Sequence, residues 1–314
     1  MSYRFSRKRL AAPVRKAGEE ESVLERLRAF LDEAEPELAA FLVHLWGYQG
    51  RAITYKALRE AILRGELDPA MVEAWQQDYV RFVRDRLSPA WEEAMTAANR
   101  ALASRFDWVF DPMGDGVRQW TENRAPDFVT ACTADQIDGL RAVVRMAAVL
   151  EDRTVDELAR AIRPMVGLYH GQATANLNYY ESLLRAGMSR EKALDLAARY
   201  GARQHRYRAF MIARTELTYA YNQGAWFGTM QARQAGLLPP VVKEWSTSAD
   251  ERVCPVCGGL DGVRREMEED FPFPTRLTDP QVRKMPPAHP NCRCAVKFIE
   301  KVDIQADQDR FAGS

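Results

Sequence analysis

Four cysteines and one histidine near the C-terminus have the types and spacing of a zinc site. Cys254 and Cys257 are separated by two residues, so one tight turn can place both sulfurs at the separation that a tetrahedral Zn²⁺ requires. His289, Cys292 and Cys294 form a second group further along the chain. Five candidates for four positions leave one spare, and in an extended chain Cys292 and Cys294 point to the same face. The pattern predicts a structural Zn²⁺. A reduced cysteine cluster, or disulfides formed after cell lysis, is the alternative.

A catalytic role has less support. A zinc knuckle followed by His-Pro-Asn-Cys resembles a treble-clef nuclease, which needs a histidine base and a further metal ligand. His289 is the only histidine of this segment, since His44, His170 and His205 lie upstream. No glycine-rich phosphate loop and no Ser-His-Asp set has suitable spacing. Cys132 is remote from the cluster and is expected to be a small buried apolar residue. We therefore expect no catalytic residues.

The segment that carries the cluster, residues 237–300, is rich in turns and prolines. Residues 241–245 and 294–299 are predicted to be short strands, and Asp261-Gly262 to be a tight turn. A module of this size rarely has enough core to fold alone. A structural zinc site contributes on the order of 10 kcal/mol of folding free energy, so the metal is the predicted staple.

The sequence before this module has the periodicity of helices. Apolar residues recur every three or four positions after Ser22, and Gly47 and Gly50 are expected to end this first helix. A second helical pattern covers residues 69–106. Glycines and prolines between residues 111 and 127 indicate a loop or a joint between subdomains.

Capping boxes at Thr133–Gln136 and Thr154–Glu157 predict helix starts near residues 134 and 155. Ser189 is expected to cap another helix. The last helix is predicted over residues 202–235 and is expected to end at Gly236. The whole of residues 20–236 is thus predicted to be helical.

This last helix contains the run Met211-Ile-Ala-Arg-Thr-Glu216, with two charges close to an apolar stripe. Arg214 and Glu216 are two positions apart and do not face one another along a helix. They are either surface charges or buried partners that dock the helix onto the β module. In the second case Trp245 and residues 250–252 are the expected counterparts.

Two groups of basic residues are candidates for contact with DNA or with an acidic partner. Residues 1–18 contain no acid and form either a solvated tail or an arm that binds phosphates. A second patch lies around His205, at the start of the predicted last helix. The candidate contact residues are Arg4, Arg7, Lys8, Arg9, Arg203, Arg206 and Arg208.

The composition excludes several classes of protein. The 314 residues contain 44 Lys plus Arg and 44 Asp plus Glu, so zero net charge argues against wholesale coating of DNA. With 46% hydrophobic and 28% charged residues the chain is neither disordered nor fibrous. No apolar run has the length of a membrane helix, and no secretion signal is recognisable. We expect a soluble, non-secreted protein of about two domains.

An ordered series of motifs resembles the phage head morphogenesis proteins, the minor head proteins of the Mu F-like class. The series covers about residues 150–298 and comprises Ile212–Glu216, Gly224, Trp245, Asp250–Cys257, Asp261-Gly262 and Pro287–Cys294. The resemblance implies that Arg214, Thr215, Glu216, Trp245 and Asp250 are structural determinants of the module, together with the five candidate ligands.

The resemblance also implies a function. It implies a minor structural protein of a tailed-phage head, present inside the capsid near the portal after assembly in the host cytoplasm. The portal is the implied partner, with major capsid or scaffolding protein and double-stranded DNA as further candidates and no membrane. The implied role is head assembly, DNA packaging or ejection, without enzymatic activity.

The predicted fold is α+β, with long helices followed by a small cysteine- and histidine-stapled β module. The predicted regions are a basic flexible arm (1–18), two helical regions (19–130 and 131–236), the β module (237–300) and a polar tail (301–314). Two other functions stay open: a DNA-binding or DNA-cleaving zinc protein, and an intracellular zinc module of host origin without a viral role.

Overall fold

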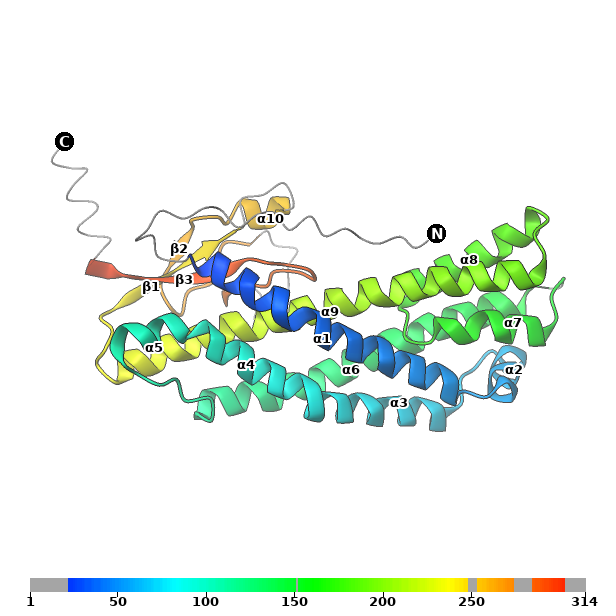
Figure 1. Ribbon diagram of the computed structural model, residues 1–314, viewed down its shortest axis with the longest axis horizontal. Helices are drawn as coiled ribbons and strands as arrows, with labels where there is room; N and C mark the ends of the chain where they lie inside the picture. The colour runs from blue at the N-terminus through cyan, green and yellow to red at the C-terminus, as the bar shows by residue number, and fades with distance from the viewer. Residues whose placement is uncertain (1–21, 151, 248–252, 274–283, 303–314) are drawn as a thin grey trace.

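A computed structural model describes residues 22–150, 152–247, 253–273 and 284–302. Long helices form one elongated body, and a small sheet lies against one side of it near one end (Figure 1). The predicted class, long helices followed by a small β module that carries the cysteines, is confirmed. No described helix has the length and apolar character needed to cross a bilayer. The helices are α1 (Val23–Ala52), α2 (Tyr55–Arg64), α3 (Pro69–Phe82), α4 (Ser88–Ala98), α5 (Arg100–Phe106), α6 (Asp115–Ala148), α7 (Val155–Ile162), α8 (His170–Arg185), α9 (Arg190–Gln234) and α10 (Pro255–Gly258), with a π-helical turn at Val83–Leu87 and a 3₁₀ turn at Arg163–Met165.

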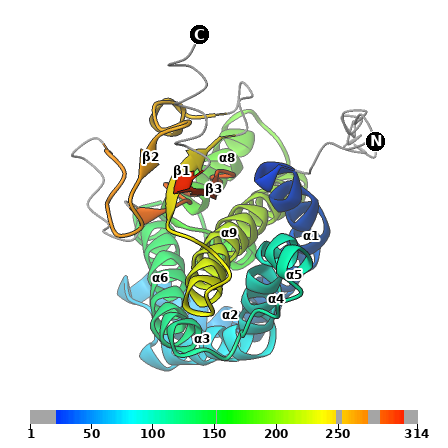
Figure 2. The ribbon, with the colours of Figure 1, turned by 90° about the vertical axis from the view of Figure 1, so that its left-hand side faces the viewer.

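Helix α9 is the central element of the body. Its 45 residues span about 68 Å at 1.5 Å per residue. Figure 2 shows α9 in the middle, with α1, α4 and α6 around it and the sheet beside it. Gly224 and Gly228 lie one turn apart and let α4 approach closely. A Cβ on Gly224 would lie 2.3 Å from the Met95 Cα, and one on Gly228 would lie 1.7 Å from the Asn99 Oδ1.

Two hydrophobic cores follow each other along the body. The first joins α1, α3, α4, the first half of α6 and the middle of α9, and includes Trp46, Trp91 and Leu217. The second joins α2, the end of α6, α7, α8 and the start of α9, and includes Val143 and Leu177. Helix α9 contributes to both cores, so it connects the parts of the helical body.

The first helix is longer than predicted, because it continues through Gly47 and Gly50 to Ala52. Glycine only weakens a helix, and packing can override that weakness. A Cβ on Gly50 would lie 3.3 Å from the Arg163 carbonyl oxygen. The glycine therefore permits a close approach of the 3₁₀ turn and does not end the helix.

The predicted helix start near residue 134 is also wrong. Helix α6 begins at Asp115 and passes through Pro126, so the predicted break between residues 111 and 127 is confined to the part before Asp115. Thr133 lies inside this helix. Gln136 accepts a hydrogen bond from the Tyr79 hydroxyl at 2.6 Å, so its side chain crosses the core and does not form a cap.

Other predicted boundaries are confirmed. The Thr154 hydroxyl accepts a hydrogen bond from the Glu157 N–H and begins α7. Ser189 precedes α9, although its side chain makes no capping hydrogen bond. Helix α9 therefore starts well before residue 202, while its predicted end is correct, with Gly236 at φ 74°.

The sheet is antiparallel and has the order β2-β1-β3. In the central strand, Lys243 pairs with Phe298 of β3. The predicted tight turn is present, and Gly262 in it has φ 72°. Both predicted strands are confirmed to within about one residue. The strands are β1 (Val241–Ser246), β2 (Arg264–Arg265) and β3 (Ala295–Glu300).

Candidate metal centre and its docking onto α9

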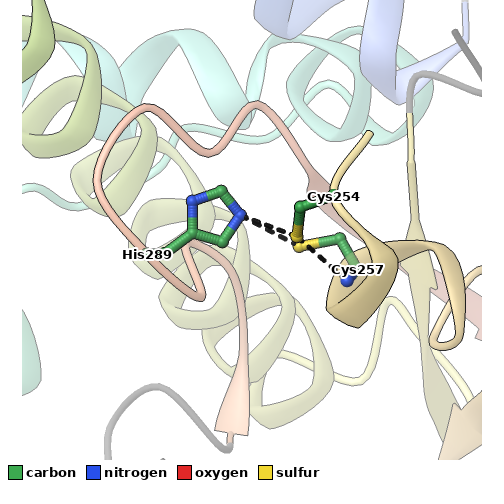
Figure 3. Close-up of side chains that lie close together, drawn as sticks. All are labelled: Cys254, Cys257 and His289. Carbon is green, nitrogen blue, oxygen red and sulfur yellow. Dashed lines mark hydrogen bonds between the residues drawn. The ribbon is translucent and has the colours of Figure 1, made fainter. Parts of the chain in front are cut away.

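The five predicted ligands lie close together in the structure. They form two overlapping groups of three, in each of which all ligand atoms lie within 4.8 Å of one another. Cys254, Cys257 and His289 form one group (Figure 3). Cys257, Cys292 and Cys294 form the other. This cluster could hold a metal ion, and Cys257 is the residue that both groups share.

The two knuckle cysteines are oriented by α10. Cys254 precedes this short helix, Pro255 is its first residue, and the Cys254 Sγ accepts a hydrogen bond from the Cys257 backbone N–H at 3.3 Å. Proline suits the first helical position because no N–H is needed there. The turn therefore places both sulfurs toward His289, as Figure 3 shows.

The distances fit a tetrahedral ion. The His289 Nε2 lies 3.1 Å from the Cys254 Sγ and 3.5 Å from the Cys257 Sγ, and the Cys257 and Cys292 sulfurs are 3.9 Å apart. Zn–S and Zn–N bonds of standard length imply about 3.6 Å between sulfur and nitrogen and about 3.8 Å between two sulfurs. These three pairs thus have nearly the spacing of ligands of one ion, and a fourth ligand would have to move closer to complete the site, because each group within 4.8 Å contains three ligand atoms.

The second ring nitrogen of His289 fixes the tautomer. The Nδ1 donates a hydrogen bond to the Pro290 carbonyl at 2.8 Å, which leaves the Nε2 lone pair directed at the sulfurs. Metal-binding histidines commonly have such a partner on the other nitrogen. The donor set and its orientation therefore fit a zinc-type ion.

The surroundings favour the ionised form of Cys254 and Cys292 and disfavour that of Cys257 and Cys294, whose thiol pKa values are raised by the neighbouring cysteines and by burial. Burial opposes ionisation of Cys254, but the Cys257 N–H and the nearby His289 lower the pKa of its thiol. Hydrogen bonds from Cys257 and Cys294 lower the pKa of the Cys292 thiol. Burial disfavours the imidazolium, yet the Pro290 carbonyl and the neighbouring sulfurs raise the pKa of His289. A metal ion would replace the protons that these groups share.

Trp245 is the aromatic centre of the module. It is fully buried, and its ring packs edge-on against Phe271 at 5.2 Å and Phe273 at 5.4 Å between ring centroids. The small core around it also contains Cys257 and Cys292. The candidate metal centre is therefore part of the module's own core.

The Arg-Thr-Glu run of α9 connects the module to two other helices. The Arg214 Nε and Nη2 donate to both carboxylate oxygens of Glu35 in α1, at 2.7 and 2.8 Å. Its Nη1 donates to the Asn291 Oδ1 at 3.3 Å. Glu216 is only 5% exposed and pairs with Arg124 of α6.

Thr215 holds the loop that carries the ligands. Its hydroxyl donates to the Met211 carbonyl and accepts the Asn291 backbone N–H at 3.0 Å. Asn291 has φ 66°, a left-handed conformation that asparagine tolerates better than most residues. The loop between two candidate ligands, His289 and Cys292, is thus fixed directly onto α9.

The interpretation of Arg214 and Glu216 as unpaired surface charges is wrong. The docking interpretation holds for Arg214 alone, because Glu216 pairs with Arg124 of α6 and makes no hydrogen bond or ion pair with a described residue of the β module. The counterparts differ from those expected, since the two side chains pair with Glu35, Asn291 and Arg124 instead of Trp245. Asp250 and its two following residues lie outside the described part of the chain.

Sequence reasoning missed Asn222, a second fixed point of the module. Its Nδ2 donates to the Cys294 carbonyl at 3.2 Å, and its Oδ1 accepts the Val296 N–H at 2.7 Å. Asn222 lies two helical turns after Thr215, on the same face. Asn222 lies on the face of α9 opposite its apolar stripe, so hydrophobic periodicity gave no signal for it.

The predicted basic patch is smaller than expected. Arg203 and Arg206 are exposed, but Arg208 is 1% exposed and donates to Asp135 and to the Gly167 carbonyl. Arg208 is therefore not available to DNA or to a partner. Cys132 is buried as predicted, and burial raises the pKa of its thiol to about 12. Arg4, Arg7, Lys8 and Arg9 lie outside the described residues.

Comparison with known proteins gives one family. Neither the curated proteins nor the solved structures contain a significant match. A family model described as Phage Mu protein F like protein matches residues 144–297, which include all of α9, the five candidate ligands and the first half of β3. Over this region the chain is similar to the phage Mu protein F like family.

Proposed function

We propose that this chain is a minor structural protein of a tailed-phage head, which associates with the portal inside the capsid and assists head assembly, DNA packaging or ejection. The family match carries this proposal, because the family indicates a head morphogenesis protein. Major capsid or scaffolding protein is a further candidate partner. The chain would act by binding and positioning, without catalysis.

The partner can be tested by native mass spectrometry of the purified chain mixed with the portal protein of the same phage. A portal ring whose mass increases by whole copies of this chain is the expected result. The major capsid protein in a parallel mixture tests the alternative partner. A folded chain that leaves the mass of the ring unchanged would refute portal association.

Zn²⁺ is the ion that best fits the candidate metal centre, held by four of Cys254, Cys257, His289, Cys292 and Cys294. The tautomer of His289 and the short distances within each group of three ligands support this assignment. Its role would be structural, because the bound loop also makes the Thr215 and Asn222 contacts. Loss of the ion would therefore free the module from α9.

The metal can be tested with Cys257→Ser, which removes the ligand common to both groups. We expect one zinc per chain in the parent protein, none in this variant, and faster amide hydrogen exchange in β1 and β3 but not in α6. Cys132→Ala, which removes a cysteine far from the cluster, should keep the zinc. A parent protein that binds no metal and protects the same amides would contradict the assignment.

The geometry favours this role over DNA cleavage. The two ring nitrogens of His289 face the cysteine sulfurs and the Pro290 carbonyl, so neither is available as a general base. Plasmid DNA incubated with the protein and Mg²⁺, Mn²⁺ or Zn²⁺ should stay intact. Nicking that is lost in His289→Ala would instead support the nuclease alternative.

A further inference from the structure

An open cleft of about 390 Å³ lies between α1, α9 and the 3₁₀ turn that follows α7. Its base includes Trp46 and His205, whose ring centroids are 5.6 Å apart. Its walls include Gly47 and Gly50 of α1 and Ala202 of α9. Because these side chains are small, the backbone of a bound segment could come close to both helices.

The charged residues that line this cleft are all basic. Arg51, Arg163 and Arg206 belong to the lining, which contains no carboxylate. Twelve other described arginines form an ion pair with a carboxylate. In the described part of the chain the three cleft arginines have none. Positive charge without a matching acid therefore gathers at one concave place.

One of the three guanidinium groups is held in a fixed position. The Arg163 Nε donates to the Gly50 carbonyl at 2.9 Å, and its Nη2 donates to the Arg51 carbonyl at 2.6 Å. The group also lies over the Tyr55 ring, 4.7 Å from the centroid. A fixed guanidinium loses less entropy when it binds an anion.

His205 adds no charge at neutral pH. Its Nε2 donates to the Val166 carbonyl at 2.8 Å, and burial lowers its pKa to about 4. The positive charge of the cleft therefore comes from the arginines alone and is present at every physiological pH.

We propose that this cleft binds an acidic segment of a partner protein. A carboxylate matches the fork of a guanidinium group with two hydrogen bonds, which Arg51 and Arg206 can offer to closely spaced acidic side chains, while Arg163 adds a fixed positive charge. The cleft has room for a few side chains between the two helices. A DNA duplex is much too wide to enter a cleft of about 390 Å³, so its phosphates could reach only the rim. The proposal goes beyond the proposed function, since it does not require the partner to be the portal.

Fluorescence anisotropy with a labelled peptide of ten glutamates and a labelled DNA duplex tests the cleft on the full-length chain. Arg51→Glu and Arg206→Glu should each weaken peptide binding at least about tenfold, since charge-assisted hydrogen bonds are lost and repulsion is added. Arg203→Glu is the matched control, because it makes the same charge change on an exposed part of α9 outside the lining. It should change peptide binding by less than about threefold.

A second variant tests the shape of the cleft without changing its charge. Ala202 is exposed, so Ala202→Trp should fill the cleft while the circular dichroism spectrum stays that of the parent. Peptide binding should be lost in this variant. Equal losses in Arg203→Glu and Arg206→Glu, or retained binding in Ala202→Trp, would overturn the proposal. So would a duplex that binds more tightly than the peptide through Arg51 and Arg206, because DNA would then be the occupant.

Discussion

Replacement of Arg214 by methionine should destabilise the protein by about 3 kcal/mol, because the change leaves the Glu35 carboxylate buried without its partner. Removing one member of a buried ion pair costs about 3–5 kcal/mol. The side chain of Glu35 is 7% exposed and that of Arg214 is 28% exposed. Because water partly reaches the Arg214 side chain, we expect a free-energy cost at the lower end of this range. The lost hydrogen bond to Asn291 acts in the same direction.

Differential scanning calorimetry should show this change as a fall in Tm of about 5 °C for a chain of this size. Arg203→Met is the matched control, since this arginine is exposed on the same helix. It should shift Tm by less than about 1 °C. Addition of Glu35→Met to Arg214→Met should recover at least about 1 kcal/mol, because the double variant buries no unpaired charge. Strictly additive costs, or an Arg214→Met protein as stable as the control, would refute the reasoning.

Two further predictions concern the packing of two glycines and the pH dependence that the buried His205 imposes on stability. Gly228→Ala should cost at least about 2 kcal/mol in urea denaturation, because its Cβ would lie 1.7 Å from the Asn99 Oδ1. Gly47→Ala should instead stabilise α1 by about 0.5 kcal/mol, since only the flexible end of Arg51 is near its Cβ; equal effects of the two substitutions would contradict this account. The third prediction concerns pH. Burial lowers the pKa of His205 from 6.5 to about 4 in the folded state, so the unfolded state binds more protons between these values. Acidification from pH 7 to pH 5 should therefore destabilise the parent protein by about 2 kcal/mol more than His205→Gln, and a parallel pH dependence of the two proteins would count against this assignment.

Local signals in the sequence predicted the features that depend on nearby residues. The zinc-knuckle spacing, the two longer strands and the capped start at Thr154 each rest on a few consecutive residues. The partner of Arg214 could not be predicted in this way, because Glu35 lies 179 positions away in the chain. The helix boundaries predicted at Thr133 and Gly47 are wrong for a related reason. Each has the local signature of a helix end, but tertiary packing keeps it inside a longer helix.

The region that matches the family does not coincide with a unit that can fold by itself. The match begins at residue 144, within α6, whereas α1 and α4 pack along α9 and lie entirely before it. Ala213, Leu217 and Ala220 of α9 are fully buried in the core that these two helices share. A fragment cut at the start of the match would expose this apolar stripe to water and should aggregate on expression. Helices α1 and α4, which precede the family match, thus cover an apolar surface of the matched region that water would otherwise reach.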